Sequence, residues 1–134
     1  MAKKETWEAI KSYFNSSEFG MDAYEKMEDD FLLSLYRFRV AVNSPIIIHV
    51  GYELTGHATN SFHYKGRAVD FHFVRWIDFR RVILAATNSG LYGVGYYTWW
   101  HPVPGFHLDN RSPSVFNIWK SPERGKYLYL LGDK

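Results

Sequence analysis

Apolar residues recur at helical spacing in three stretches of the chain. In the clearest, Lys26 to Val42, apolar residues follow one another at intervals of four, four, three and four: Met27, Phe31, Leu35, Phe38 and Val42. These intervals place a single apolar stripe along one side of a helix. Similar but shorter patterns predict a first helix at Thr6 to Tyr13 and a third at Trp76 to Ser89, with Gly90 as its C-terminal cap.

Patterns typical of strands begin after Pro45. The run Ile46 to Val50 is β-branched at nearly every position, which predicts a buried strand. Ala68 to Phe73 alternates, so that Asp70 and His72 share one face and apolar residues the other. Gly and Pro separate four later runs: Val94 to Tyr97, Phe106 to Leu108, Val115 to Trp119 and Tyr127 to Leu131. We therefore expect a single α+β domain over residues 1–134, with helices packed on one side of a central antiparallel sheet.

Composition narrows the classes of function. A chain of 134 residues with 46% hydrophobic content can bury one core, and its net charge of only +2 favours neither nucleic acid nor a membrane as partner. The absence of cysteine excludes disulfides, thiolate zinc ligands and a cysteine nucleophile. The chain contains no apolar run of signal-peptide length, so we expect synthesis in the cytoplasm, and we expect a monomer.

Histidines are numerous, and several lie in or beside the long loop from Tyr52 to Lys65. A catalytic zinc ion is held by three protein ligands, here necessarily imidazoles and carboxylates, and keeps a fourth position open. The pool of candidate ligands is His63, Asp70, His72, His107 and Asp109. Because residues two apart on a strand share a face, spacing alone does not choose among them.

Two motifs do distinguish these residues. The segment Ser61 to Asp70 reads SFHYKGRAVD and resembles the S-x-H-x-x-G-R-A-x-D signature of the zinc D-Ala-D-Ala carboxypeptidase and peptidoglycan endopeptidase superfamily. Gly93 to Tyr97, Phe106 to Asp109 and Trp119 resemble the G-x-G-x-Y, F-x-H-x-D and W elements of its bacterial and phage branch, in the same order. The stretch 56–70 is also similar to the zinc site of the hedgehog signalling domain, a relative by fold.

The resemblance, which covers nearly the whole chain, implies one Zn²⁺ held by His63, Asp70 and His107. It implies hydrolysis of an amide bond in a peptidoglycan stem peptide or crosslink, as in a carboxypeptidase, endopeptidase or endolysin-like enzyme. Ser61 and His72 are then expected to support a ligand or line the substrate groove. The aromatic run Tyr96 to Trp100, with Trp119, predicts either a wall of that groove or part of the core.

The general base is left open by the sequence. Carboxypeptidases of this superfamily carry an acidic residue three positions before the last histidine, and this chain has Pro104 there. The replacements are His101, which we favour, and Asp109, which could instead orient a ligand. His57 matches a histidine beside the zinc of hedgehog relatives and could stabilise an oxyanion. Glu53 stands where relatives often carry an arginine that holds substrate.

These departures keep two other functions open. The chain could be a catalytically silent zinc-binding module that recognises a cell-wall peptide or a protein partner, or a structural component of a phage. Pro104 and Glu53 favour a silent module, whereas the complete set of zinc ligands favours the enzyme.

Overall fold

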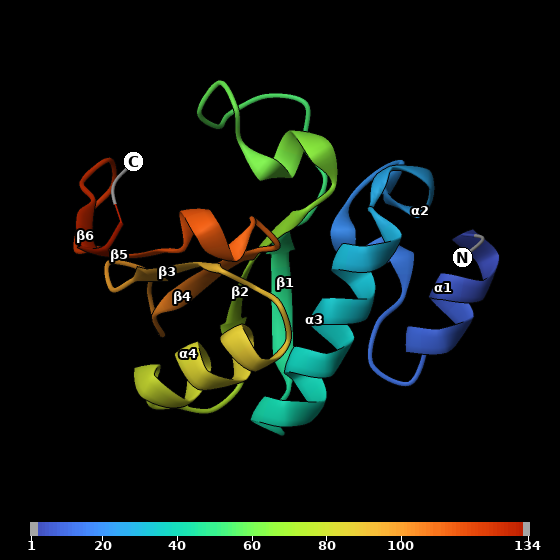
Figure 1. The fold of residues 1–134 in the computed structure, drawn as a ribbon, viewed down its shortest axis with the longest axis horizontal. Coiled ribbons are helices and arrows are strands. Elements are labelled where there is room, and N and C mark those ends of the chain that lie inside the picture. The colour runs from blue at the N-terminus through green and yellow to red at the C-terminus, as the bar shows by residue number, and fades with distance from the viewer. Residues whose placement is uncertain (1–2, 133–134) are drawn as a thin grey trace.

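The computed structural model describes residues 3–132, shown in Figure 1. Within this range the chain forms α-helices and a mixed six-stranded sheet, so the α+β class is confirmed. The helices are α1 (Lys3–Ile10), α2 (Ala23–Lys26), α3 (Asp29–Val42) and α4 (Phe79–Asn88), with 3-10 turns η1 (Ser16–Phe19), η2 (Phe62–Lys65) and η3 (Pro113–Val115). The strands are β1 (Ile46–Val50), β2 (Ala68–Phe73), β3 (Gly93–Tyr97), β4 (Gly105–Asp109), β5 (Asn117–Ser121) and β6 (Leu128–Leu131).

The sheet runs in the order β1-β2-β4-β3-β5-β6, and its strands are not all antiparallel. β3 and β5 pair in parallel, whereas the other neighbours are antiparallel, so the prediction of an antiparallel sheet was wrong at this pair. The chain turns back after β3 to form β4 and then crosses over to the free side of β3. Because β5 runs opposite to β4, from which the chain comes, it runs in the same direction as β3.

The long helix predicted from Lys26 begins later than its apolar stripe suggests. α2 ends at Lys26, Met27 is extended with φ −71° and ψ 131°, and α3 begins at Asp29. The backbone N–H of Glu28 donates to the carbonyl of Gly66 at 2.9 Å, which ties this break to the turn before β2. Met27 is still fully buried, because an extended segment can reach the same core.

The other two helices differ from prediction mainly at their ends. α1 begins at Lys3 and ends at Ile10, and Phe14 reaches the core from the turn that follows. α4 begins after Asp78, whose side chain accepts the N–H of Arg80 as an N-terminal cap. Gly90 takes a positive φ of 82° just beyond α4, the left-handed conformation that glycine tolerates best after a helix.

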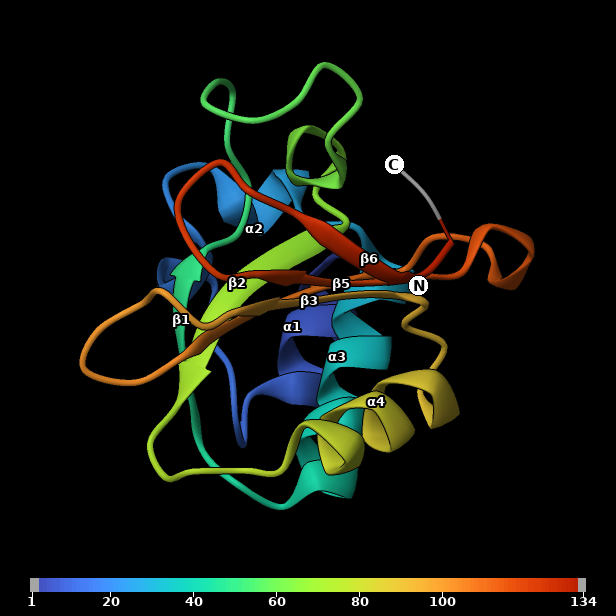
Figure 2. The same ribbon diagram turned by 90° about the vertical axis from the view of Figure 1, so that its left-hand side faces the viewer.

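The two faces of the sheet have different surroundings, as Figure 2 shows. α3 and α4 cover one face, and α1 packs against α3. Strand residues on that face are apolar and almost completely buried: Val69, Phe71, Phe73, Phe106 and Leu108. The segment before β2 lies over the opposite face, where β2 and β4 carry their polar residues. One face of the sheet is therefore core, and the other is available for chemistry.

β1 is an edge strand and is buried on only one of its faces. Ile46 is buried while Ile47 is 47% exposed, so the predicted burial of the whole run was wrong. β-branched residues favour a strand but do not fix its position in the sheet. Within residues 3–132, no helix is both long and apolar enough to cross a membrane.

Candidate metal centre

Strand register brings two of the expected zinc ligands together. Asp70 of β2 lies directly opposite His107 of β4. Because their neighbours Phe71 and Leu108 point into the core, Asp70 and His107 lie on the other face of the sheet. The same row continues across the sheet through Gly95 and Trp119. His63 joins the pair from η2, and one ligand atom from each of His63, Asp70 and His107 lies within 4.8 Å of the others. All three side chains are buried, so this group could hold a metal ion.

Local hydrogen bonds fix the orientation of His63. Ser61 caps η2, because its Oγ accepts the backbone N–H of His63 at 3.2 Å. The ring Nδ1 of His63 donates to the carbonyl of Gly51 at 3.0 Å. This bond leaves Nε2 facing Asp70, with 3.4 Å between Nε2 and Oδ2. Nε2 is therefore the nitrogen that His63 presents to a metal.

Gly66 allows the ligand turn to meet the strand. It takes a φ of +67° between η2 and β2, and a side chain there would place its Cβ 2.0 Å from the carbonyl oxygen of Lys26. Only glycine combines this conformation with such a close approach. The turn thus carries the chain from His63 to Asp70 in seven residues, as the SFHYKGRAVD motif requires.

His107 is held between two carboxylates. Its Nδ1 lies 3.0 Å from Oδ1 of Asp70, and its Nε2 lies 2.7 Å from Oδ2 of Asp109. Asp109 is fully buried and also accepts hydrogen bonds from Nε and Nη2 of Arg111, at 2.8 and 2.7 Å. A carboxylate behind a ligating histidine orients the ring and increases its basicity. Of the two roles left open for Asp109, this geometry favours the orienting one.

Three groups of this cluster have strongly shifted pKa values even without a metal ion. Burial would raise the pKa of the Asp70 carboxyl, but hydrogen bonds with His107 and His63 outweigh it and hold that pKa below its usual range. Burial would also raise the pKa of the Asp109 carboxyl, but its hydrogen bonds with Arg111 and His107 outweigh burial and hold that pKa below its usual range. Burial would lower the pKa of His107, but hydrogen bonds with Asp109 and Asp70 raise it to about 9. Without a metal ion, His107 is therefore a charged imidazolium at neutral pH, with a proton on each ring nitrogen.

Metal binding should displace one of these protons. Because a ligating imidazole must be deprotonated, we expect about one proton to leave His107 for each metal bound at pH 7. The apparent metal affinity should then rise about tenfold per pH unit as pH increases toward 9, and level off above it. Titration calorimetry in buffers of different ionisation enthalpy measures the released protons directly. Binding without proton release would show that His107 is neutral in the metal-free protein or is not a ligand.

Tyr97, the tyrosine of the G-x-G-x-Y element, is a site residue to which the sequence analysis gave no role of its own. Its hydroxyl donates to Oδ1 of Asp70 at 3.3 Å, and it lines the cavity above the triad. Burial, together with the negative charge of Asp70, raises its pKa well above the usual value, so the hydroxyl stays a neutral donor. The predicted Tyr96 faces the opposite side, stacked 4.9 Å from Phe106 in the core. Strand alternation from Gly95, opposite His107, would have selected Tyr97.

The other aromatic and histidine candidates lie beside the triad. Trp100 stacks on Tyr97, with ring centroids 5.2 Å apart, and so braces it from the side. His72 shares the site face, but its Nδ1 lies 2.5 Å from Nε2 of His49, and it is not part of the metal-ligand group. The side chain of His72 therefore contacts β1 at the edge of the sheet. This contact depends on the pairing of β1 with β2, which residue spacing does not predict.

Three glycines make room for side chains over the site face. A Cβ at Gly93 would lie 2.1 Å from Oδ1 of Asp109, one at Gly95 would lie 2.6 Å from the indole of Trp119, and one at Gly105 would lie 2.1 Å from the indole of Trp100. Because Gly93 and Gly95 have no side chains, they leave room for the carboxylate of Asp109, which orients His107, and for the indole of Trp119.

Gly95→Ala should disturb the site through Trp119. We expect a loss of about 1–3 kcal/mol in the free energy of unfolding, because the added methyl group overpacks a rigid strand, and weaker metal binding. Denaturant unfolding and metal titration measure the two effects. Gly56→Ala is the control, since no atom lies within 4 Å of its Cβ and only its positive φ adds strain. Equal metal affinity in both variants would contradict a role for Trp119 beside His107.

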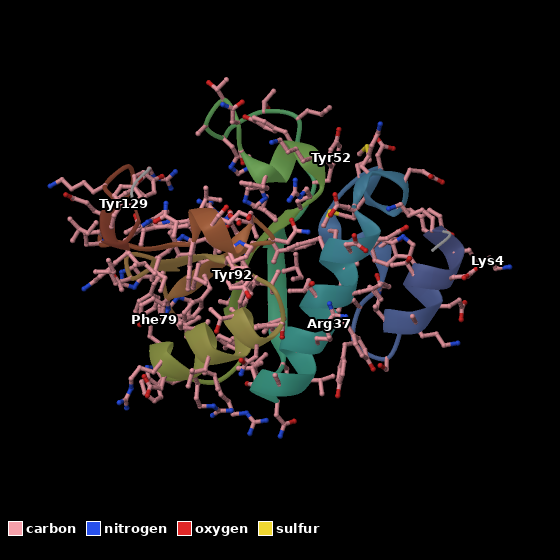
Figure 3. All side chains as sticks on the ribbon, viewed as in Figure 1. Lys4, Arg37, Tyr52, Phe79, Tyr92 and Tyr129 are labelled. Atoms are coloured by element: carbon pink, nitrogen blue, oxygen red, sulfur yellow. The ribbon has the colours of Figure 1, made fainter. Side chains whose placement is uncertain are left out.

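A cavity of about 560 Å³ opens above the triad. One wall is the loop before η2 and the other is β6, where Figure 3 labels Tyr129. The residues that line it are His57, Ala58, Thr59, Asn60, Ser61, Phe62, His63, Tyr97, His107, Asp109, Arg111, Asn117, Trp119, Tyr127 and Tyr129. A cavity of this size admits several residues of a peptide above the buried ligands.

The candidates for acid–base chemistry are placed very differently. The ring of His57 stacks on that of His63, with centroids 4.2 Å apart, and its backbone is held by the hydroxyl of Tyr64. Burial lowers the pKa of His57, so its imidazole is neutral at pH 7. His101, which the sequence favoured, is exposed in the loop between β3 and β4 and does not line the cavity. Pro104 lies elsewhere, beside Trp76.

Comparison of the chain with known protein families finds no match, and comparison with curated proteins finds none either. The function is therefore indicated by the geometry of the site and by the two motifs in the sequence.

Proposed function

We propose that this protein is a zinc-dependent peptidase that hydrolyses an amide bond in peptidoglycan stem peptides or crosslinks, with the fold of the zinc D-Ala-D-Ala carboxypeptidase superfamily. The observation that carries the proposal is the buried group of His63, Asp70 and His107 beneath a cavity of about 560 Å³. The SFHYKGRAVD motif supplies two of these residues, and the F-x-H-x-D motif supplies the third.

The donor set fits zinc. Two imidazole nitrogens and one carboxylate are a common protein ligand set for catalytic zinc and leave a fourth position open. The second nitrogen of each imidazole is occupied by Gly51 or Asp109, so the remaining nitrogens point at Asp70. When bound, zinc supplies a Lewis acid and lowers the pKa of its water toward about 7.

Residues that line the cavity transfer protons, position Asp70 and bind the peptide. His57 is neutral at pH 7 and lies directly against His63, so we assign it the proton transfers: it takes a proton from the attacking water and returns one to the leaving amine. Tyr97 holds Asp70 in place through its neutral hydroxyl. Trp119, Tyr127 and Tyr129 offer apolar and hydroxyl surface along which a peptide can lie.

His57→Gln should separate catalysis from metal binding. We expect kcat to fall about 10²–10⁴-fold, because the amide cannot accept a proton, while the zinc content stays at one per chain. His101→Gln is the matched control and should change kcat by less than about threefold, since an exposed loop histidine makes no contact with the site. A large loss in His101→Gln and none in His57→Gln would reverse the assignment.

A zinc-binding module without activity is the second candidate. Among the described residues of the cavity lining, Asp109 is the only carboxylate, and it is occupied by His107 and Arg111. The position at which carboxypeptidases of the superfamily carry an acid is Pro104. If His57 does not replace that acid, the site binds zinc and peptide without cleavage.

One experiment distinguishes the two candidates. Purified protein is assayed for metal by elemental mass spectrometry, and the native, chelated and His63→Ala proteins are incubated with purified peptidoglycan. Stoichiometric zinc with new peptide fragments only from the native protein is the expected result. Zinc without fragments would favour the silent module, and absence of bound zinc at neutral pH would overturn both.

A further inference from the structure

We infer that the site cuts an internal amide bond, with the peptide chain continuing on both sides of the cut, and does not release a single terminal residue. The inference depends on the proposed peptidase function and adds the class of bond. It comes from the charged and polar groups that face the cavity.

The cavity offers no uncommitted cation to a terminal carboxylate. Cleaving off a terminal residue would bring its carboxylate close to the triad, and a carboxylate removed from water needs a cationic partner. Arg111 is the only lysine or arginine among the described lining residues. Its Nε and Nη2 already donate to Asp109, and its guanidinium lies over Phe62 and Trp119, 5.3 and 5.5 Å from their centroids. Asp109 thus balances the charge of Arg111 before any substrate enters.

A negative charge lies just outside the cavity, next to His57 of its lining. Oε1 of Glu53 lies 3.4 Å from Nε2 of His57, and the Glu53 side chain is 46% exposed. A substrate carboxylate beside His57 would meet the like charge of Glu53, at an exposed position where water screens part of the repulsion.

The uncharged polar groups of the lining suit a peptide backbone. Hydroxyl and amide side chains line the cavity from both walls: Thr59, Asn60, Ser61, Asn117, Tyr127 and Tyr129. Such groups donate to and accept from neutral N–H and C=O groups of a peptide. The segment that fits best over the triad is therefore a stretch of uncharged backbone, which exists only inside a chain.

Two matched peptides test this in the metal-free protein, because a bound metal ion would itself attract a carboxylate. A stem pentapeptide with a free C terminus and the same peptide amidated there are titrated by calorimetry. We expect the amide to bind at least as tightly as the acid. In Glu53→Arg the acid should gain about tenfold in affinity, whereas Glu25→Arg, at an exposed position in α2, should leave the ratio unchanged. An acid that binds the unaltered protein tenfold more tightly than the amide overturns the inference.

Products from the native protein provide the second arm. Mass spectrometry of digested, crosslinked peptidoglycan should find new ends within stem peptides or crosslinks. Release of single C-terminal amino acids would overturn the internal cut and leave the peptidase intact. If the native protein cleaves nothing and neither peptide binds, the proposed function fails and this inference fails with it.

Discussion

Asp70→Asn is expected to weaken metal binding strongly at neutral pH and, with it, the proposed peptidase activity. Asp70 is the only carboxylate in the buried metal-ligand group and faces both His63 and His107. Asparagine keeps the shape but removes the negative charge, so we expect the metal affinity to fall by more than about a hundredfold, the upper range for losing a mere orienting partner. Competition with a fluorescent zinc chelator measures the change.

His72→Asn is the matched control for this variant. His72 lies two residues along the same face of β2 but contacts His49 and not the triad. Its replacement should leave the metal affinity within about threefold, as for a substitution outside the site. If both variants lose zinc equally, the ligand set includes His72, and the proposed triad is wrong.

Asp109→Ala is expected to cost both stability and metal affinity. The fully buried carboxylate accepts hydrogen bonds from Arg111 and pairs with Nε2 of His107, so its removal leaves a guanidinium without its partner. Breaking a buried ion pair in this way costs about 3–5 kcal/mol in the free energy of unfolding. Losing the group that orients a ligating histidine should weaken metal binding about 10–100-fold. Urea unfolding and chelator competition measure the two losses.

Two further variants show whether the unpaired cation causes the loss of stability. Asp30→Ala, at an exposed position in the first turn of α3, should cost no more than about 1 kcal/mol. Adding Arg111→Met to Asp109→Ala should recover part of the lost stability, because the double variant buries no lone charge. If the double variant is less stable than Asp109→Ala alone, Arg111 stabilises the fold mainly by packing against Phe62 and Trp119.

The features predicted most closely from sequence are those set by neighbouring residues. The alternation of Ala68 to Phe73 gave the bounds of β2 and placed Asp70 and His72 on one face. The stripe through Phe31, Leu35 and Phe38 identified the buried side of α3. Both patterns follow from the fixed direction of successive side chains along a strand or a helix. Such local geometry can be read without knowing which elements meet.

The choice among the candidate ligands needed more than spacing. Pattern alone left five residues, and the motif reduced them to His63, Asp70 and His107. The structure brings these three together while it turns His72 toward His49 and sets Asp109 behind His107. The contact that sets the role of His72 joins β1 to β2, which are distant in the chain. The contacts that set the role of Asp109 are local, to His107 and Arg111, but spacing alone does not show which way these side chains turn.

The sequence by itself determined the class of fold and, through the motifs, the residues able to bind a metal. Only the tertiary structure decided that β3 and β5 run parallel, that Tyr97 and not Tyr96 faces Asp70, and that His57 and not His101 lies at the cavity. Each of these depends on which strands become neighbours and which way they run. The order and direction of the strands are set by the packing of the whole core. No periodic pattern of residues in the sequence encodes them.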